Sequence, residues 1–227
     1  MTLSLRRHRL LTVAALALTA ALLALAFSAA RGVNAHAAAR DVAHFNLVAN
    51  PKFAACLARN PGDPSQAPKA EVTVTRGELN DQLTLRIHNV KPHLAFDLFT
   101  VQNSSLLASG KADPAFKNFG LAWYQSDVQA DADGNGTVHV RTILLNQIFG
   151  FDPNVSLDPT NTFHLGFWFN NPNDAAACGF DPSHPTPFNG EHKAGPLAMI
   201  SVPDATTTLG PLCINPDTSV SPVRCNP

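Results

Sequence analysis

The chain has 227 residues, of which 45% are hydrophobic and 15% charged, which suffices for one globular domain with its own core. Twelve of the sixteen basic residues and all seventeen acidic residues fall after residue 37, so that part of the chain carries a net charge of −5. An acidic chain without basic clusters argues against nucleic acid as a partner.

The first 37 residues have the order of a secretory signal peptide. Arg6, Arg7 and Arg9 precede an apolar run over residues 10–27, and small residues with the spacing of a cleavage site follow. We therefore expect an exported protein, either secreted or held at the cell surface. The apolar run is nearly long enough to cross a bilayer, so an uncleaved anchor is the alternative. Retention of that anchor is the only membrane contact that we expect.

Four cysteines follow the signal segment: Cys56, Cys178, Cys213 and Cys225. In an oxidising compartment an even number of cysteines predicts disulfides, and four cysteines leave three connectivities open. No two of them have C-x-x-C spacing, which makes them poor metal-site candidates. We expect a structural role for all four.

Short segments of alternating polarity predict antiparallel strands in the first half of the domain. They are enriched in β-branched and aromatic residues, and they cover residues 44–48, 71–76, 82–90 and 94–101; residues 51–59 are either a turn or two of helix or an irregular excursion held by Cys56. Asp97 is the exception, because it is a carboxylate inside an otherwise apolar strand. A buried carboxylate must be paired, so a structural pair with an arginine such as Arg86 is the favoured interpretation, and a functional site is the alternative.

The stretch over residues 121–145 predicts two strands joined by a tight polar turn, that is, a hairpin. Asp131, Asp133 and Asn135 in this turn also spell D-x-D-x-N-G, the opening of a calcium-binding loop. A complete loop of that kind has a bidentate Glu at its twelfth position, and that position is Thr142 here. We therefore favour the hairpin turn and keep calcium as an alternative.

The segment over residues 162–170 is the most apolar strand candidate, with Phe163, Leu165, Phe167 and Phe169 on one face and His164, Gly166 and Trp168 on the other, which predicts a central strand covered on both sides. Prolines interrupt the chain after residue 171, and only residues 197–202 still resemble a strand. The sequence thus predicts an all-β fold: an antiparallel Greek-key β-sandwich with a long irregular, disulfide-stapled C-terminal segment. We assign residues 1–37 to the signal segment, residues 41–212 to a single sandwich domain and residues 213–227 to a C-terminal tail.

The densest group of metal-ligating side chains is His184, Glu191 and His192, with Asp181 nearby. Their spacing matches no zinc signature, and a polar loop punctuated by prolines explains them equally well. Four aromatic residues could line a groove for glycans or peptides, although aromatic residues on strands are more often part of a core; these are Trp123, Tyr124, Phe167 and Trp168. No G-x-S-x-G motif of a nucleophilic serine is present in the sequence.

The order of these motifs resembles a known family. The succession EVTVT, LTLRIHNVKPHLAFDLFTVQ, SDVQADADGNGTVHVRTILL and TFHLGFWFN, followed by AAACG, is similar to the strand order of the copper/zinc superoxide dismutase sandwich and, more loosely, of chordin-repeat domains. The similarity covers residues 71–179 and implies a shared scaffold.

The same resemblance implies that the copper site is missing. Where the family has its His-x-His copper pair, this chain has Asp97 and Phe99, and the late-strand ligand position, at residues 167–169, holds no histidine. The loop after Val101 contains no cysteine where the family keeps the disulfide partner of its Ala-Cys-Gly cysteine. The resemblance therefore implies that Cys178 pairs elsewhere, and that the chain shares a scaffold and not an activity.

We predict a secreted or cell-surface β-sandwich protein with a non-catalytic, binding or structural role, an unidentified extracellular partner, and no cofactor unless calcium is bound. One alternative is a calcium-stabilised extracellular module. The other is a metal-binding protein or metalloenzyme with a rearranged histidine site, built from His139, His164, His184 and His192.

Overall fold

The computed structural model describes residues 42–77, 80–143, 162–186, 193–213, 216–217 and 224–225. All of them belong to one compact unit, Arg40–Pro227. The predicted signal segment, Glu191 and His192 lie outside the described residues, and so does the side chain of Cys225.

The described elements follow the predicted order. The strands are β1 (Val42–Ala49), β2 (Lys69–Thr75), β3 (Asn80–His88), β4 (Ala95–Val101), β5 (Ala122–Gln129), β6 (Gly136–Ile143), β7 (Thr162–Phe169), β8 (Leu197–Ser201), β9 (Leu212–Cys213), β10 (Pro216–Asp217) and β11 (Arg224–Cys225). The helical segments are α2 (Ala54–Leu57), η1 (Pro64–Gln66) and η3 (Pro172–Cys178). The short helix η3 and the strands after β8 were not predicted.

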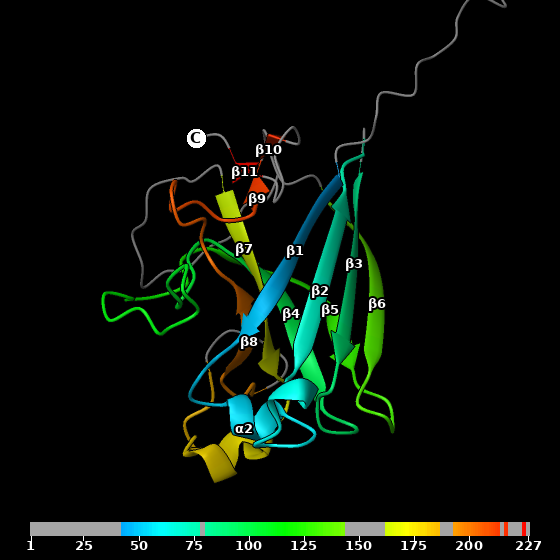
Figure 1. Cartoon of the computed structure of the whole chain (residues 1–227), viewed down its shortest axis with the longest axis vertical. Coiled ribbons are helices and arrows are strands. Elements are labelled where there is room, and N and C mark those ends of the chain that lie inside the picture. The colour runs from blue at the N-terminus through cyan, green and yellow to red at the C-terminus, as the bar shows by residue number, and fades with distance from the viewer. Residues whose placement is uncertain are drawn as a thin grey trace, which may run out of the picture. The chain divides into compact units, whose positions relative to one another are not determined.

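The sheet confirms the all-β antiparallel fold class. Its strand order is β5-β4-β7-β8-β1-β2-β3-β6, with β9 attached to β7 and with β10 and β11 forming a separate pair (Figure 1). The end strands β5 and β6 contact each other, so the sheet nearly closes on itself. Around the sheet, β4, β5 and β6 are neighbours in the order of the sequence, and β3, which precedes them in the chain, lies on the far side of β6. This is a Greek-key arrangement.

One local prediction was wrong. The strands and the polar turn of the predicted hairpin exist, but β5 pairs with β4 and β6 pairs with β3, so the two are not hydrogen-bonded partners in the sheet order. The register explains β6, because Val138 and Val140 stand opposite Leu85 and Leu83 of β3. Cross-strand packing therefore decides the pairing, and the turn only reverses the chain.

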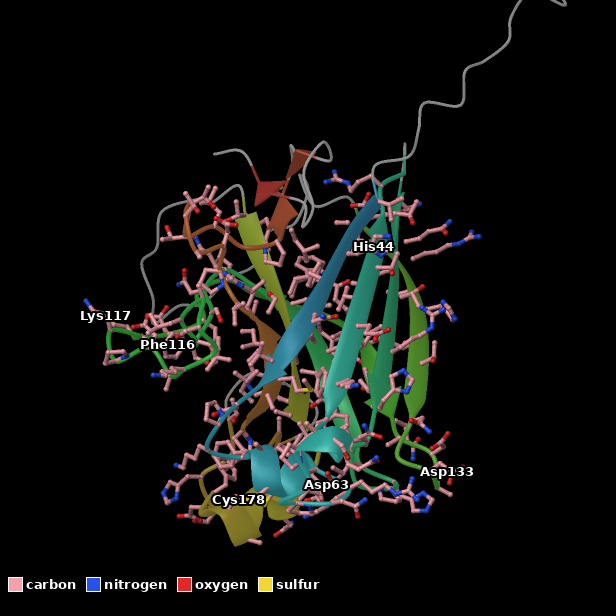
Figure 2. All side chains as sticks on the ribbon, viewed as in Figure 1. His44, Asp63, Phe116, Lys117, Asp133 and Cys178 are labelled. Carbon is pink, nitrogen blue, oxygen red and sulfur yellow. A yellow bond between two sulfur atoms is a disulfide. The ribbon has the colours of Figure 1, made fainter. Side chains whose placement is uncertain are left out.

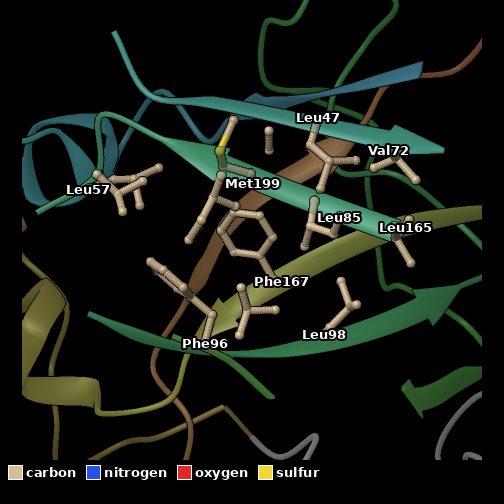
Figure 3. Packing of buried hydrophobic residues seen from close by; sticks show 14 of the residues in the cluster. Leu47, Leu57, Val72, Leu85, Phe96, Leu98, Leu165, Phe167 and Met199 are labelled. Atoms are coloured by element: carbon tan, nitrogen blue, oxygen red, sulfur yellow. The ribbon is translucent and has the colours of Figure 1, made fainter. Parts of the chain in front are cut away.

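The main core lies between the two halves of this curved sheet. β3 contributes Leu83, Leu85 and Ile87 by strict alternation, because every second residue of a strand points to the same face. β4 and β7 face them with Phe96, Leu98, Leu165 and Phe167, all of them fully buried (Figure 3).

β7 is buried on both faces, as predicted for a central strand. All eight of its residues are buried. Its outer face carries Trp168, which packs in a second apolar cluster with Phe99, Val101, Leu106, Ala194, Leu197 and Ile200. Gly166 fits between these side chains because a Cβ there would lie 3.0 Å from the carbonyl oxygen of Met199 and 3.1 Å from Ile200. The cover on this outer face comes from the connection after β4 and from the segment that leads into β8.

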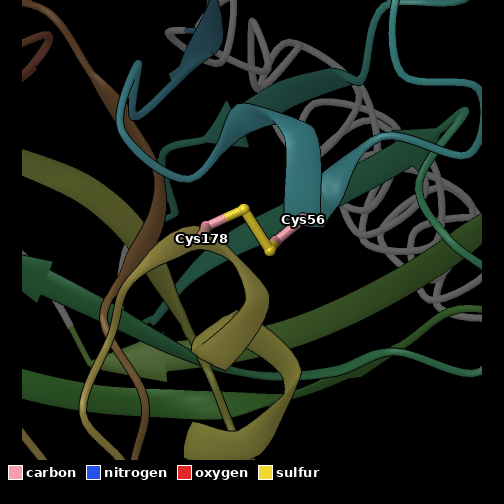
Figure 4. The surroundings of a disulfide bond; sticks show 2 residues. All are labelled: Cys56 and Cys178. Atoms are coloured by element: carbon pink, nitrogen blue, oxygen red, sulfur yellow. A yellow bond between two sulfur atoms is a disulfide. The ribbon is translucent and has the colours of Figure 1, made fainter.

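The disulfide connectivity that the sequence left open is in part settled. Cys56 in α2 pairs with Cys178 at the end of η3, across a sequence separation of 122 residues (Figure 4). Cys213 is disulfide-bonded as well. The Cys56–Cys178 bond fixes the two short helical segments to one another beneath the sheet strands that lead into them.

Removing this bond should cost stability, because it closes a very long loop in the unfolded chain. We expect the double variant Cys56→Ala/Cys178→Ala to lose about 2–4 kcal/mol of unfolding free energy, measured by urea denaturation. The control Ala55→Ser, at an exposed neighbouring position of α2, should change stability by less than about 0.5 kcal/mol. An unchanged urea midpoint in the double variant would mean that the bond contributes little.

Candidate functional site

Asp97 lies on the outer face of β4, opposite Trp168 of β7, and has no exposed surface. Its Oδ1 accepts a hydrogen bond of 2.8 Å from the side-chain amide of Asn170. Arg86, the partner considered from the sequence, is exposed on β3, where it stands opposite Glu71 and Thr137. The buried carboxylate is thus held by a neighbouring amide at the end of β7.

Aromatic rings fill the space next to Asp97. Phe99 packs edge-on against Trp168 and against Tyr124, each with ring centres 5.5 Å apart, and Phe119 also packs edge-on with Trp168, with ring centres 5.0 Å apart. Of the four aromatic residues considered for a groove, Phe167 and Trp168 are buried, Trp123 is half-buried, and Tyr124 is exposed and donates a hydrogen bond to Asp127. This part of the outer face is a packed cluster.

The turn over residues 131–136 is held by its own polar groups. Oδ1 of Asp131 accepts the backbone N–H groups of Asp133 at 2.8 Å and Asn135 at 2.9 Å, and the bond from Asn135 is the main cause that lowers the pKa of Asp131. Oδ1 of Asn135 accepts a hydrogen bond from Nδ1 of His88 at 3.1 Å. Asp133 is exposed at the tip of the turn (Figure 2).

The conformation of this turn requires a glycine at position 134. Its φ is +74°, and a Cβ there would lie 2.0 Å from the carbonyl oxygen of Val90. The tight polar turn is therefore confirmed, with Asp131, Asp133 and Asn135 in one loop. Calcium binding by these residues stays a prediction.

His184 pairs with Asp181 on the surface. Nδ1 of His184 lies 2.8 Å from Oδ2 of Asp181, and both side chains are exposed. The hydroxyl and backbone N–H of Ser183 bind Oδ1 of the same aspartate, and together these contacts, the Ser183 hydroxyl first, lower the pKa of Asp181 to about 2. The pair forms a local polar turn after η3.

The other histidines of the rearranged site lie on separate elements. His139 is exposed on β6 and shares a hydrogen bond of 3.0 Å with Thr84 of β3, whereas His164 is buried on β7. Within the described part of the chain, no group of three or more His, Cys, Asp or Glu side chains is arranged to hold a metal ion.

A cavity of about 520 Å³ opens at the other end of the outer face, beyond the aromatic cluster. Three segments that are far apart in the sequence form its walls: residues 102–118 after β4, Thr162 and His164 of β7, and residues 203–210 after β8. A volume of this size is within the range of small-molecule sites. The cavity is the main candidate site among the described residues.

His164 forms the buried polar part of this cavity. It is 4% exposed, and its Nδ1 lies 3.0 Å from the carbonyl oxygen and 3.1 Å from the hydroxyl of Ser201. A carbonyl can only accept, so Nδ1 carries the proton and Nε2 carries the lone pair. Burial is the main cause that lowers the pKa of His164 to about 4, so the ring is neutral at neutral pH.

Nε2 of His164 is the ring nitrogen that reaches the cavity. It has no hydrogen-bond partner among the described residues, while every fully buried side-chain nitrogen and oxygen in that part of the chain has one. Nε2 must therefore keep some accessible surface, and the cavity is the space that His164 lines. A neutral imidazole in this state offers one hydrogen-bond acceptor to a bound molecule.

The other polar side chains of the cavity lining either bond neighbouring wall segments or are exposed to solvent. Several side chains hold the walls together: Oε1 of Gln102 accepts the N–H of Leu121, the amide of Asn103 donates to the carbonyl of Asn118, and the hydroxyl of Thr162 accepts the N–H of Gly210. Lys117 is exposed and, within the described residues, forms no ion pair. Phe116 lies beside it on the loop between β4 and β5 (Figure 2).

The sequence did not reveal this site. From the sequence, His164 is a candidate only as one member of a histidine metal site, and residues 102–118 show no catalytic or metal-binding motif. The signal that could have found it is a histidine on an otherwise apolar strand with both faces covered, because such a ring must have a polar environment.

Comparisons with known proteins give no assignment. No family model, no curated protein and no solved structure matches the chain. In the part of the chain that the structure describes, no helix is both long enough and apolar enough to span a membrane.

The buried His164 should make folding sensitive to acid. Its pKa is about 4 in the folded chain and 6.5 in an unfolded one, so the unfolded state binds more protons between these values and stability falls as the pH falls. We expect His164 to account for a loss of about 3 kcal/mol of unfolding free energy between pH 7 and pH 4. Urea denaturation at the two pH values measures it.

The matched variant for this measurement is His164→Asn, because the asparagine amide can still donate to the carbonyl of Ser201 but does not titrate. Its stability should depend on pH less steeply than that of the wild type by the same amount. Equal slopes for the two proteins would show that His164 is not buried as a neutral ring.

Proposed function

We propose that this protein is an exported, non-catalytic binding protein whose ligand site is the cavity over His164. The observation that carries the proposal is the cavity itself, in which a buried neutral imidazole directs one free acceptor nitrogen toward an otherwise mostly uncharged lining. Binding sites for small molecules have this character: a concave surface with a few fixed polar groups.

The arrangement around His164 favours binding over nucleophilic catalysis. Ser201 lies next to the ring, but it is 1% exposed, and its hydroxyl accepts the backbone N–H of Leu165 at 3.1 Å. Nδ1 of His164, the nitrogen that faces Ser201, carries a proton and cannot act as its base. The serine therefore orients the imidazole and is not placed to attack a substrate.

We further propose that the scaffold is that of the copper/zinc superoxide dismutase-like sandwiches without their metal. The succession of strands β2 to β7 supports this proposal, since these are the segments that carry the resemblance. At the two positions of the family's copper pair, Asp97 is bound by Asn170 and Phe99 is packed among aromatic rings. Neither side chain offers an imidazole to a metal.

Export is supported by two features. Residues 1–37 have the order of a signal segment, and the Cys56–Cys178 disulfide is of a kind that persists in oxidising compartments. The partner that we propose is accordingly an extracellular small molecule.

Elemental analysis of the protein recovered from the culture medium or cell surface tests the proposal. We expect far less than one tightly held transition metal per chain. We also expect the intact mass of a chain that has lost its signal segment, and an increase of that mass on reduction by the four hydrogens that two disulfides take up. About one bound transition metal per chain would contradict the proposal and favour the rearranged histidine site. Recovery of the protein from the cytoplasm alone, reduced and with its signal segment intact, would contradict the export.

A further inference from the structure

We infer that the cavity over His164 binds a small neutral sugar, a monosaccharide or disaccharide, and that Nε2 of His164 accepts a hydrogen bond from one of its hydroxyl groups. This inference rests on the proposed binding function and names the class of ligand.

The first argument is the state of the imidazole. The proton on Nδ1 is fixed by the carbonyl of Ser201 at 3.0 Å, so the nitrogen that reaches the cavity can only accept. A ligand that satisfies it must bring an O–H or N–H donor. A buried acceptor also discriminates strongly against ligands that lack the donor, because such ligands would leave it unpaired.

The second argument is charge. Lys117 is exposed at the cavity, and Asp113 is half-buried in the same wall, where one carboxylate oxygen accepts the N–H of Ala115 at 2.8 Å. These two opposite charges leave the wall without a net charge, so it selects neither an anion nor a cation by net charge, and both groups can hydrogen-bond a hydroxyl. The wall therefore favours a neutral molecule whose groups both donate and accept.

The third argument is the apolar part of the wall. Phe116 is half-buried, with its ring 4.7 Å from that of Phe119, and Leu107 is 41% exposed, which is unusual among the large apolar side chains of the described residues. The amide-bearing residues Asn103 and Asn118 belong to the same cavity lining. A sugar has a C–H face for the ring and leucines and a hydroxyl rim for the amides, so it matches both.

Ligand-observed saturation-transfer NMR with defined probes tests the inference. The neutral probes are glucose, galactose, mannose, N-acetylglucosamine, maltose and cellobiose, and the charged comparators are glucuronate and glucosamine. We expect the exported full-length protein to bind at least one neutral probe more tightly than either comparator. Loss of one hydrogen bond should weaken that binding roughly tenfold in His164→Asn.

Two further variants keep the result interpretable. His139→Asn changes an exposed histidine on β6 and should bind like the wild type. Phe116→Ala removes the apolar platform without changing β7 and should weaken binding even if His164→Asn folds poorly. Binding of none of the neutral probes, preferential binding of glucuronate or glucosamine, or equal affinity in the His164→Asn and wild-type proteins would overturn the inference.

The outcome is separable from that of the proposed function. A metal-free exported protein that binds no neutral sugar would remove the ligand class and leave the binding role in place. A metal-loaded protein would remove the binding proposal itself.

Discussion

The fold depends on the burial of β7 on both of its faces. One face closes the main core, and the other must be covered by chain that is not part of the sheet, because a strand with eight buried residues cannot face water. The connection after β4 and the segments before and after β8 provide that cover. These segments show no regular pattern in the sequence, but in the structure they form a second apolar layer over the outer face.

Covering this face forces its polar side chains to find partners inside the protein. Asp97 and His164 occupy the two ends of the outer face, and both are at least nine-tenths buried. Asn170 donates to the first, and Ser201 accepts from the second. The two ends then differ: around Asp97 the aromatic rings pack closely, while over His164 the covering segments leave an open volume. This difference is why the cavity, and not the carboxylate, is the candidate site.

Sequence reasoning succeeded where local pattern decides the structure. Alternation and enrichment in strand-forming residues located β1 to β8, and the apolar character of both faces of β7 identified it as central. The turn over residues 131–136 was predictable because Gly134 and Asp131 satisfy requirements that are local to the turn. The partner strands of β5 and β6 were not, since pairing depends on which apolar faces meet across the sheet.

The site itself was beyond prediction for the same reason. Its walls come from three segments between residues 102 and 210 that are far apart in the sequence and meet only because β4, β7 and β8 are neighbours in the sheet. The Cys56–Cys178 pairing and the Asn170 partner of Asp97 are likewise products of the fold. The sequence pattern showed that a carboxylate and a histidine lay on buried strands, but it contained no information about which groups would satisfy them.

The most direct test of this account is the tautomeric state of His164, observed in a long-range nitrogen–proton NMR correlation spectrum of the folded protein. The account predicts a neutral ring at pH 7 and still at pH 5, with the proton on Nδ1 and an unprotonated Nε2. A ring protonated on Nε2, or one that titrates between pH 6 and 7 as an exposed histidine does, would contradict it.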